Sequence, residues 1–268
     1  MSLADLLRRA DLSYLESWRE LTRWTADGTI LETRDLLCFA PPTRSRGFNG
    51  AMRCGAGVAP DAERTVALAR DFFAARQRGF TLHTREHLDG DLVAVAEAAG
   101  FERLRPDAPI MVLARPVRDP VLDPPLRLVD VDDDAGAADF AAVACAAYAA
   151  TGISFDVLAR VFAGGARVRA PHVAITVAYD RDVPIAGGFV LLGHGIAGVY
   201  WIGTTPAGRR RGAADAVTRH LGNLAFARGA ALVVLQASEQ GRPIYQRIGY
   251  REVSSYRRYL VRNAAASP

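Results

Sequence analysis

A proline-rich segment near the middle of the chain most constrains how this sequence can fold. Residues 115–125 read Arg-Pro-Val-Arg-Asp-Pro-Val-Leu-Asp-Pro-Pro and hold four prolines in eleven residues. Proline lacks a backbone N–H and fits neither a helix interior nor a central strand. The segment is therefore expected to be a semi-rigid linker. We predict two domains, at residues 1–115 and 126–262, joined by a linker at 116–125.

The second half alternates between strand-like and helix-like patterns. Apolar alternation, turn residues and helical spacing define its elements. We predict strands at 126–131, 173–178, 185–192, 196–204 and 232–235. We predict one helix that ends at about residue 150 and a second over 155–162, capped by Ser154. Further helices are predicted from Gly212 to about 228 and near 243–247, followed by a closing hairpin at 250–261.

The first half follows a similar order with weaker signals. We predict helices over 3–24, from the cap residue Asp61, and near 91–99. Strands are predicted at 29–33, 36–39, 48–53, 80–84 and 110–113. The element Ala98-Ala-Gly-Phe101 matches Arg247-Ile-Gly-Tyr250 in type and position, which indicates an ancient duplication.

The most informative motif lies where one predicted strand gives way to a long helix. Residues 201–214 read Trp-Ile-Gly-Thr-Thr-Pro-Ala-Gly-Arg-Arg-Arg-Gly-Ala-Ala. A helix N-terminus presents unpaired N–H groups and a favourable dipole to an anion. A glycine at 212 lets the backbone approach a phosphate closely, and three arginines add fork-shaped donors. The motif predicts a pyrophosphate site.

The element order, Arg209-Arg-Arg-Gly212-Ala-Ala214 and the later Tyr245-Gln-Arg-Ile-Gly-Tyr250 together resemble the GNAT superfamily of N-acetyltransferases. The resemblance implies an α/β (α+β) chain of two GNAT-like domains. Each would hold a mixed, mostly antiparallel, splayed sheet flanked by helices. It also implies that acetyl-CoA binds as co-substrate to the second domain. The implied cofactor-binding residues are Ile202, Thr204, Arg209, Arg210, Arg211, Gly212, Ala213, Ala214 and Ser238.

Two side chains are candidates for catalysis. Tyr245 fits a proton donor to the departing thiolate, although a buried tyrosine is also a common core residue. Glu239 is a candidate base, with an exposed charge at a helix start as the alternative. The carboxylate that the family often places on the strand before the loop is missing from residues 197–202. His194 and His172 are further candidates because histidine is a common base near neutral pH, but His194 lies in a Gly-His-Gly turn.

Composition narrows the remaining function classes. No lysine occurs among the 33 basic residues, which excludes Schiff-base chemistry and a Walker lysine. Three dispersed cysteines predict free thiols and no metal site. The net charge of +4 is spread along the chain and gives little support to nucleic-acid binding. The N-terminus does not resemble a signal peptide, and no apolar run reaches the ~20 residues of a membrane span, so we expect a cytoplasmic protein.

The sequence therefore predicts an acetyl-CoA-dependent N-acetyltransferase that acts on a primary amine of a small molecule or peptide. The first domain lacks the arginine cluster, and Asp61 places an acid at the equivalent helix start, so we expect that domain to bind no CoA. A non-catalytic acyl-CoA-binding or sensing protein is the alternative. No nucleic-acid or membrane partner is expected, and a homodimer is possible.

Overall fold

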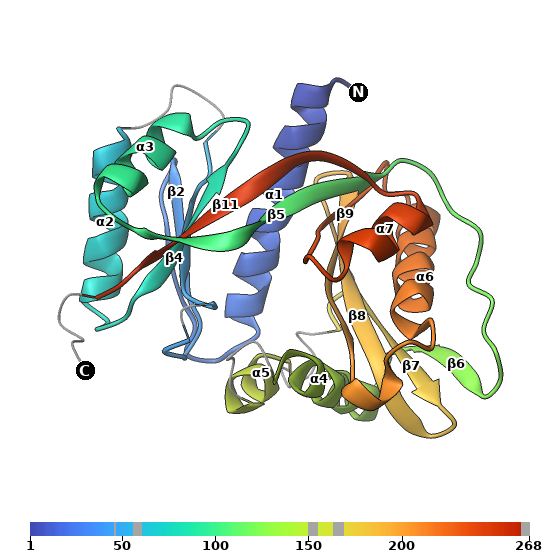
Figure 1. The fold of residues 1–268 in the computed structure, drawn as a ribbon. Helices are drawn as coiled ribbons and strands as arrows, with labels where there is room; N and C mark the ends of the chain where they lie inside the picture. The colour runs from blue at the N-terminus through green and yellow to red at the C-terminus, as the bar shows by residue number, and fades with distance from the viewer. Residues whose placement is uncertain (46, 56–60, 150–154, 163–168, 264–268) are drawn as a thin grey trace. The chain divides into compact units, whose positions relative to one another are not determined.

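The chain folds into two compact units. The computed structural model describes residues 1–45, 47–55, 61–149, 155–162 and 169–263. Unit 1 comprises Met1–Ile110 together with Val253–Pro268, and unit 2 comprises Met111–Glu252 (Figure 1). Within each unit the strands are mixed in direction, mostly antiparallel and flanked by helices, which confirms the predicted fold class. The end of the chain belongs to unit 1, so the domain predicted at 126–262 does not coincide with unit 2.

The sheet of unit 1 is built from segments distant in the sequence. Its strand order is β1-β2-β3-β4-β11-β5. The β3 and β4 strands are parallel, whereas the pairs β1–β2, β2–β3 and β4–β11 are antiparallel. The strand bounds are β1 Thr29–Glu32, β2 Leu36–Ala40, β3 Gly50–Arg53, β4 Phe80–Arg85, β5 Glu102–Leu113 and β11 Arg251–Val261.

Two of these strands differ from prediction. The hairpin predicted at 250–261 is wrong: β11 is one strand of eleven residues, paired from Tyr256↔Arg85 to Val261↔Phe80. No Gly, Pro, Asn or Asp interrupts it, so its sequence favours no tight turn. The β5 strand is longer than the predicted 110–113 because its first half is largely exposed and polar, which conceals the apolar periodicity.

Helices cover both faces of the unit 1 sheet. The α1 helix (Leu3–Arg23) packs on one face, where Tyr14 stacks on Tyr256 of β11 with ring centroids 4.5 Å apart. The α2 (Ala62–Ala74) and α3 (Gly90–Ala98) helices share a core with Tyr259 of β11, which points to the other face because strand side chains alternate. Asp61 caps α2 as predicted, accepting the backbone N–H of Glu63 at 2.9 Å.

Unit 2 has the strand order β10-β9-β8-β7-β6. The β9 and β10 strands are parallel, and the remaining neighbours are antiparallel. The strand bounds are β6 Leu126–Asp130, β7 Val173–Asp180, β8 Val183–Gly193, β9 Ile196–Thr204 and β10 Val233–Gln236. The helix bounds are α4 Asp134–Tyr148, α5 Phe155–Phe162, α6 Ala213–Ala227 and α7 Arg242–Ile248. The predicted Ser154 cap of α5 lies outside the described residues.

The helices of unit 2 also form two layers around the sheet. Phe140 of α4 contacts Phe189 of β8 edge to face at 6.3 Å. The next β8 residue, Val190, packs with the predicted α6 core residues Val217 and Leu221 on the opposite face. The proline-rich segment forms no helix or strand and, near its own start, contacts α6, where the Val117 N–H donates to Asn223 Oδ1 at 2.9 Å.

Candidate functional site

The predicted site residues gather at one end of unit 2, where β9 and β10 separate. The ladder between these strands records only the pairs Val233↔Ala197 and Val234↔Gly198. The β9 strand continues to Thr204 and β10 to Gln236. The predicted splaying of the two strands is therefore confirmed. The second half of β9 consequently presents a backbone edge that β10 does not cover among the described residues.

A bulge marks the point of separation. The β8–β9 register shifts between Gly187 and Phe189, so that Trp201 and Ile202 lie opposite one residue of β8. Trp201 has φ +54°, a conformation that costs a bulky side chain about 1–2 kcal/mol. Its ring is held edge-on by Tyr148 at 4.8 Å and Phe162 at 5.0 Å.

Tyr148 is a site residue that the sequence analysis missed. Its hydroxyl donates to the Ile202 carbonyl at 2.9 Å, so this carbonyl already has a protein partner. Thr204 lies opposite Ala186 on β8. Only the position of Tyr148 as the last residue of an alanine-rich helix sets it apart in the sequence, and that is a weak signal.

The turn between β9 and α6 has the backbone conformation that a small residue requires. Thr205 Oγ1 accepts the Gly208 N–H at 3.2 Å across a short 3₁₀ turn, η3 (Pro206–Gly208). Gly212 then adopts φ +76° as the N-cap of α6, and a Cβ placed there would meet nothing within 4 Å. Left-handed backbone explains the glycine, and the open space beside it leaves room for a ligand.

The start of α6 supplies unpaired hydrogen-bond donors. The first intrahelical bond runs from the Ala216 N–H to the Gly212 carbonyl at 2.9 Å. Within the described part of the chain, the N–H groups of Ala213, Ala214 and Asp215 make no hydrogen bond. Such amides favour an anion together with the helix dipole. The Asp215 carboxylate adds a negative charge here, but Arg219 pairs with it at 2.5 Å.

The three arginines of the turn are not equivalent. Arg209 and Arg210 are exposed and form no ion pair with any described residue. Arg211 instead pairs with Asp180 at the end of β7, with Nη1 and Oδ2 2.5 Å apart. Two of the three predicted cationic side chains are thus available to a ligand, and the third is engaged within the protein.

Tyr245 lies on α7 in a buried environment. Its ring contacts Tyr250 at 6.0 Å, and its hydroxyl forms no hydrogen bond with the described residues. Burial raises the pKa of Tyr245 to about 12, and no charged group contributes to this shift. The phenol therefore keeps its proton at neutral pH, and no carboxylate perturbs it.

The other predicted residues lie between β10 and α7. Ser238 Oγ accepts the Gly241 N–H at 3.1 Å, so this serine stabilises the turn that leads into α7. Glu239 is exposed and forms no ion pair with a described residue. His194 lies in the β8–β9 turn, at the opposite end of β9 from the bulge.

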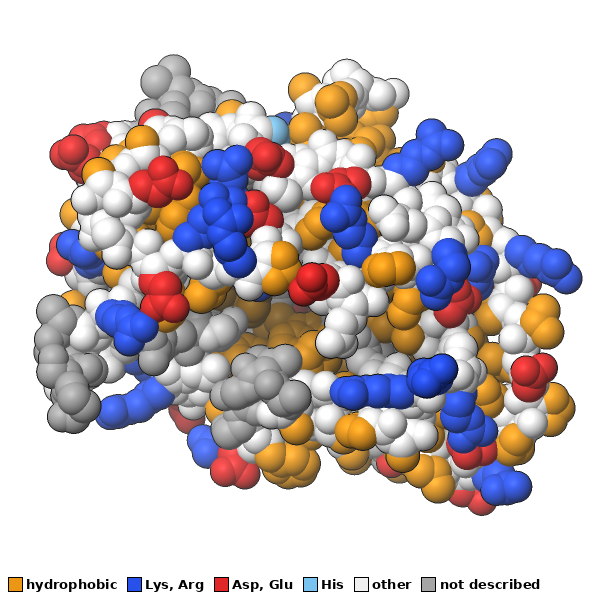
Figure 2. Space-filling model, in the orientation of Figure 1, with side chains coloured by type: hydrophobic (Ala, Val, Ile, Leu, Met, Phe, Trp, Pro, Cys, Tyr) orange, Lys and Arg blue, Asp and Glu red, His pale blue; other side chains and the backbone are white. Residues whose placement is uncertain are grey.

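The remaining chemical groups are scattered. Cys38 and Cys145 are buried free thiols, and Cys54 is half-buried. Among the described residues, no three His, Cys, Asp or Glu side chains are placed to hold a metal ion. None of the helices described is both long enough and apolar enough to span a bilayer. Acidic and basic side chains intermingle among the described residues on the face shown in Figure 2.

A comparison with protein families covers the same region of the chain. Residues 165–253 match the family model for an acetyltransferase (GNAT) domain, a range that includes the β9–α6 turn and Tyr245. No curated protein sequence matches the chain.

Solved structures of similar fold extend over nearly the whole chain. A GCN5-related N-acetyltransferase from Kribbella flavida is 19% identical, with a TM-score of 0.72 over 97% of this chain and 96% of that one. One from Sphaerobacter thermophilus is 14% identical, with a TM-score of 0.63 over 97% and 93%. A tandem GNAT protein from the clavulanic acid biosynthesis pathway is 15% identical, with a TM-score of 0.60 over 87% and 79%. These likenesses show that the chain has the GNAT fold.

Proposed function

We propose that the chain is a tandem GNAT protein whose unit 2 binds acetyl-CoA and transfers the acetyl group to a primary amine of a small molecule or peptide. The observation that carries this proposal is the turn at Gly212. Its left-handed backbone, open space and unpaired amides at the start of α6 suit a diphosphate. Arg209 and Arg210 add two exposed cations.

The two units contain the same parallel arrangement of strand, helix and strand. In unit 1, α2 connects the parallel strands β3 and β4, and in unit 2, α6 connects β9 and β10. This shared arrangement supports a duplication. In unit 1, Asp61 occupies the N-cap of α2, where its carboxylate competes with an anionic ligand. We assign CoA binding to unit 2 alone.

The residues of unit 2 would divide the chemistry between them. Acetyl-CoA supplies a thioester, whose acyl carbon accepts the amine. The start of α6, from Gly212 to Ala214, would hold the diphosphate, and the free edge of β9 would align the extended arm. The Ile202 carbonyl accepts the Tyr148 hydroxyl and retains a second lone pair for the arm.

Tyr245 would stabilise the departing sulfur. Its pKa of about 12 lies well above the ~8.5 of an ordinary thiol, so complete proton transfer from the resting phenol is uphill. A phenol with this pKa can still donate a hydrogen bond to the developing thiolate, and this is the role proposed for Tyr245. Glu239 is the proposed base and would act directly or through water. The strand before the turn offers no alternative, because residues 197–202 contain no carboxylate.

One observation favours a second function, acyl-CoA binding without transfer. Residues 197–202, on the strand before the turn, contain no carboxylate that could serve as a base. The experiment measures CoA binding by calorimetry and thiol release from acetyl-CoA with a panel of amines. Binding with amine-dependent thiol release supports the transferase. CoA binding with no more thiol release than a heat-killed control supports the sensor. The absence of CoA binding contradicts both functions.

A further inference from the structure

Unit 1 contains a serine, a histidine and an aspartate in a hydrogen-bonded row. Ser254 Oγ of β11 lies 2.9 Å from His87 Nδ1, in the segment between β4 and α3. His87 Nε2 lies 3.1 Å from Oδ2 of Asp11 on α1. All three belong to unit 1, although Asp11 and Ser254 are far apart in the sequence.

Asp11 is a buried acceptor, 4% exposed. The Tyr256 hydroxyl donates to its Oδ1 at 2.8 Å, and Arg85 Nη1 lies 3.7 Å from its Oδ2. A guanidinium and a hydroxyl donor stabilise the negative charge of a carboxylate that is removed from water. Asp11 therefore remains an acceptor for the His87 ring N–H.

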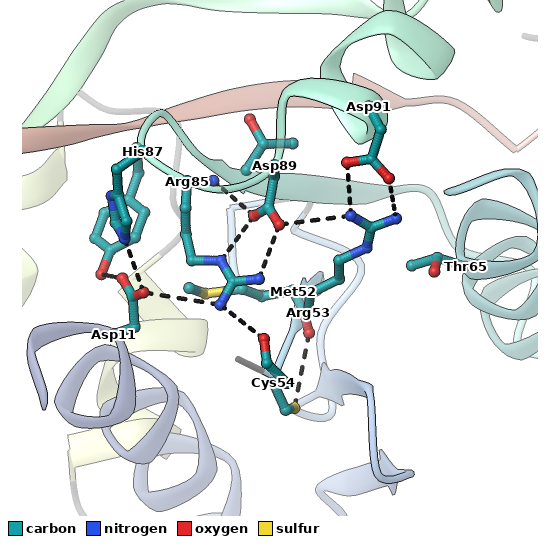
Figure 3. A network of polar contacts seen from close by, with 12 residues as sticks. Asp11, Met52, Arg53, Cys54, Thr65, Arg85, His87, Asp89 and Asp91 are labelled. Carbon is teal, nitrogen blue, oxygen red and sulfur yellow. Dashed lines mark hydrogen bonds and ion pairs between the residues drawn. The ribbon is translucent and has the colours of Figure 1, made fainter. Parts of the chain in front are cut away.

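Arg85 is itself fixed by a buried ionic network (Figure 3). Its Nε and Nη2 atoms each lie 2.8 Å from a different oxygen of Asp89. Arg53 pairs with Asp91 at 2.8 Å and lies 3.6 Å from Asp89. Bidentate contacts of this kind hold both partners in one geometry. The network thereby fixes the guanidinium that faces Asp11.

The partners of His87 determine its tautomer. An ionised Asp11 accepts hydrogen bonds only, so His87 Nε2 carries the proton, and Nδ1 offers its lone pair to the Ser254 hydroxyl. The same order of nucleophile, base and carboxylate activates serine in enzymes of unrelated fold. The His87 side chain is 18% exposed and Ser254 is half-buried.

We propose that Ser254 is a nucleophile that accepts an acyl group from a small activated ester or thioester, with His87 as its base. Ser254 Oγ forms a bond to the acyl carbon, and the bond from that carbon to the alcohol or thiol breaks. The serine proton passes to His87 Nδ1 and then to the departing oxygen or sulfur. The imidazolium that forms in between donates from Nε2 to Asp11.

The neighbouring Ser255 provides a matched control. It is 7% exposed, and its hydroxyl donates to Glu86 Oε2 at 2.8 Å, so it faces a carboxylate rather than an imidazole. Its carbonyl accepts the Glu86 N–H at 3.0 Å. The two serines are adjacent in one strand and point to opposite faces of the sheet. Only Ser254 has the partner that activates a nucleophile.

The test uses the full chain and a fluorophosphonate probe, which phosphonylates an activated serine with loss of fluoride. Intact mass and tandem fragmentation locate the adduct, and p-nitrophenyl acetate reports acyl transfer. Wild type and Ser255→Ala are expected to label at Ser254, whereas Ser254→Ala does not. In His87→Gln, the labelling rate is expected to fall about 10²–10⁴-fold, the contribution of a general base.

Circular dichroism and thermal melting establish that each variant is folded before labelling. Folded wild type that remains unlabelled overturns the proposal. Equal labelling of Ser254→Ala, or an unchanged rate in folded His87→Gln, overturns it as well. Neither reagent involves CoA, so the outcome is independent of the function proposed for unit 2.

Discussion

Gly212 and Gly229 form a matched pair that separates backbone strain from ligand binding. They flank α6, with φ +76° and +87°, and a Cβ at either position meets nothing within 4 Å. Alanine at either site must adopt left-handed backbone, which costs about 1–2 kcal/mol. Both Gly→Ala variants should therefore melt roughly 2–8 °C below wild type, taking ~2–4 °C per kcal/mol for a domain of 150–250 residues.

The two variants should differ in CoA affinity. At Gly212 the added methyl enters the space assigned to the diphosphate, whereas Gly229 lies at the other end of the helix. We expect Gly212→Ala to weaken CoA binding at least about tenfold, or ~1.4 kcal/mol. Gly229→Ala should remain close to wild type, and Gly212→Glu should abolish binding because it adds charge as well as bulk.

Isothermal calorimetry with CoA measures the affinities, and thermal melting measures the shared strain. If Gly212→Ala binds CoA as tightly as Gly229→Ala, the diphosphate does not approach this turn. The glycine would then be explained by its backbone angle alone, and the cofactor site would have to lie elsewhere.

Three further changes test other parts of the structure. Tyr245→Phe removes a hydrogen bond to developing charge, worth ~1.5–3 kcal/mol, so turnover should fall roughly 10- to 150-fold with little change in CoA affinity; wild-type turnover would reduce Tyr245 to a packing role. Asp89→Asn leaves Arg85 without its bidentate partner in a buried site, so urea unfolding should show a loss of about 3–5 kcal/mol, and a loss below about 1 kcal/mol would contradict the buried-charge account. Burial lowers the pKa of His83 from 6.5 to about 3, so the unfolded chain binds the extra proton and stability should fall as pH drops from about 6.5 towards 3, by up to ~1.4 kcal/mol per pH unit. In His83→Gln this part of the pH dependence of unfolding should be absent, and equal slopes for the two proteins would refute it.

Local signals predicted most of the elements because those elements follow simple periodicities. The β9 strand runs from Ile196 to Thr204 as predicted, and α6 ends before Gly229, whose φ of +87° explains the stop. Asp61 was recognisable as a helix cap from its side chain alone. In each case, the residues that determine the structure lie within a few positions of one another.

The missed features depend on partners distant in the sequence. Nothing near Trp201 signals φ +54°, because a bulky aromatic residue disfavours that conformation and tertiary contacts impose it. The engagement of Arg211 by Asp180 depends on β7 ending beside the turn. The row from Asp11 through His87 to Ser254 joins three segments that only the folded sheet of unit 1 brings together.

The return of β11 to unit 1 has a consequence for biosynthesis. The Tyr256 hydroxyl bonds to an aspartate 245 positions earlier, and β11 lies between β4 and β5 in the sheet. A ribosome adding roughly 5–20 residues per second delivers the whole of unit 2 before this strand emerges. Unit 1 therefore lacks the strand between β4 and β5 until the end of the chain is made. Removal of the last fifteen or so residues should leave unit 2 intact and make unit 1 sensitive to proteolysis.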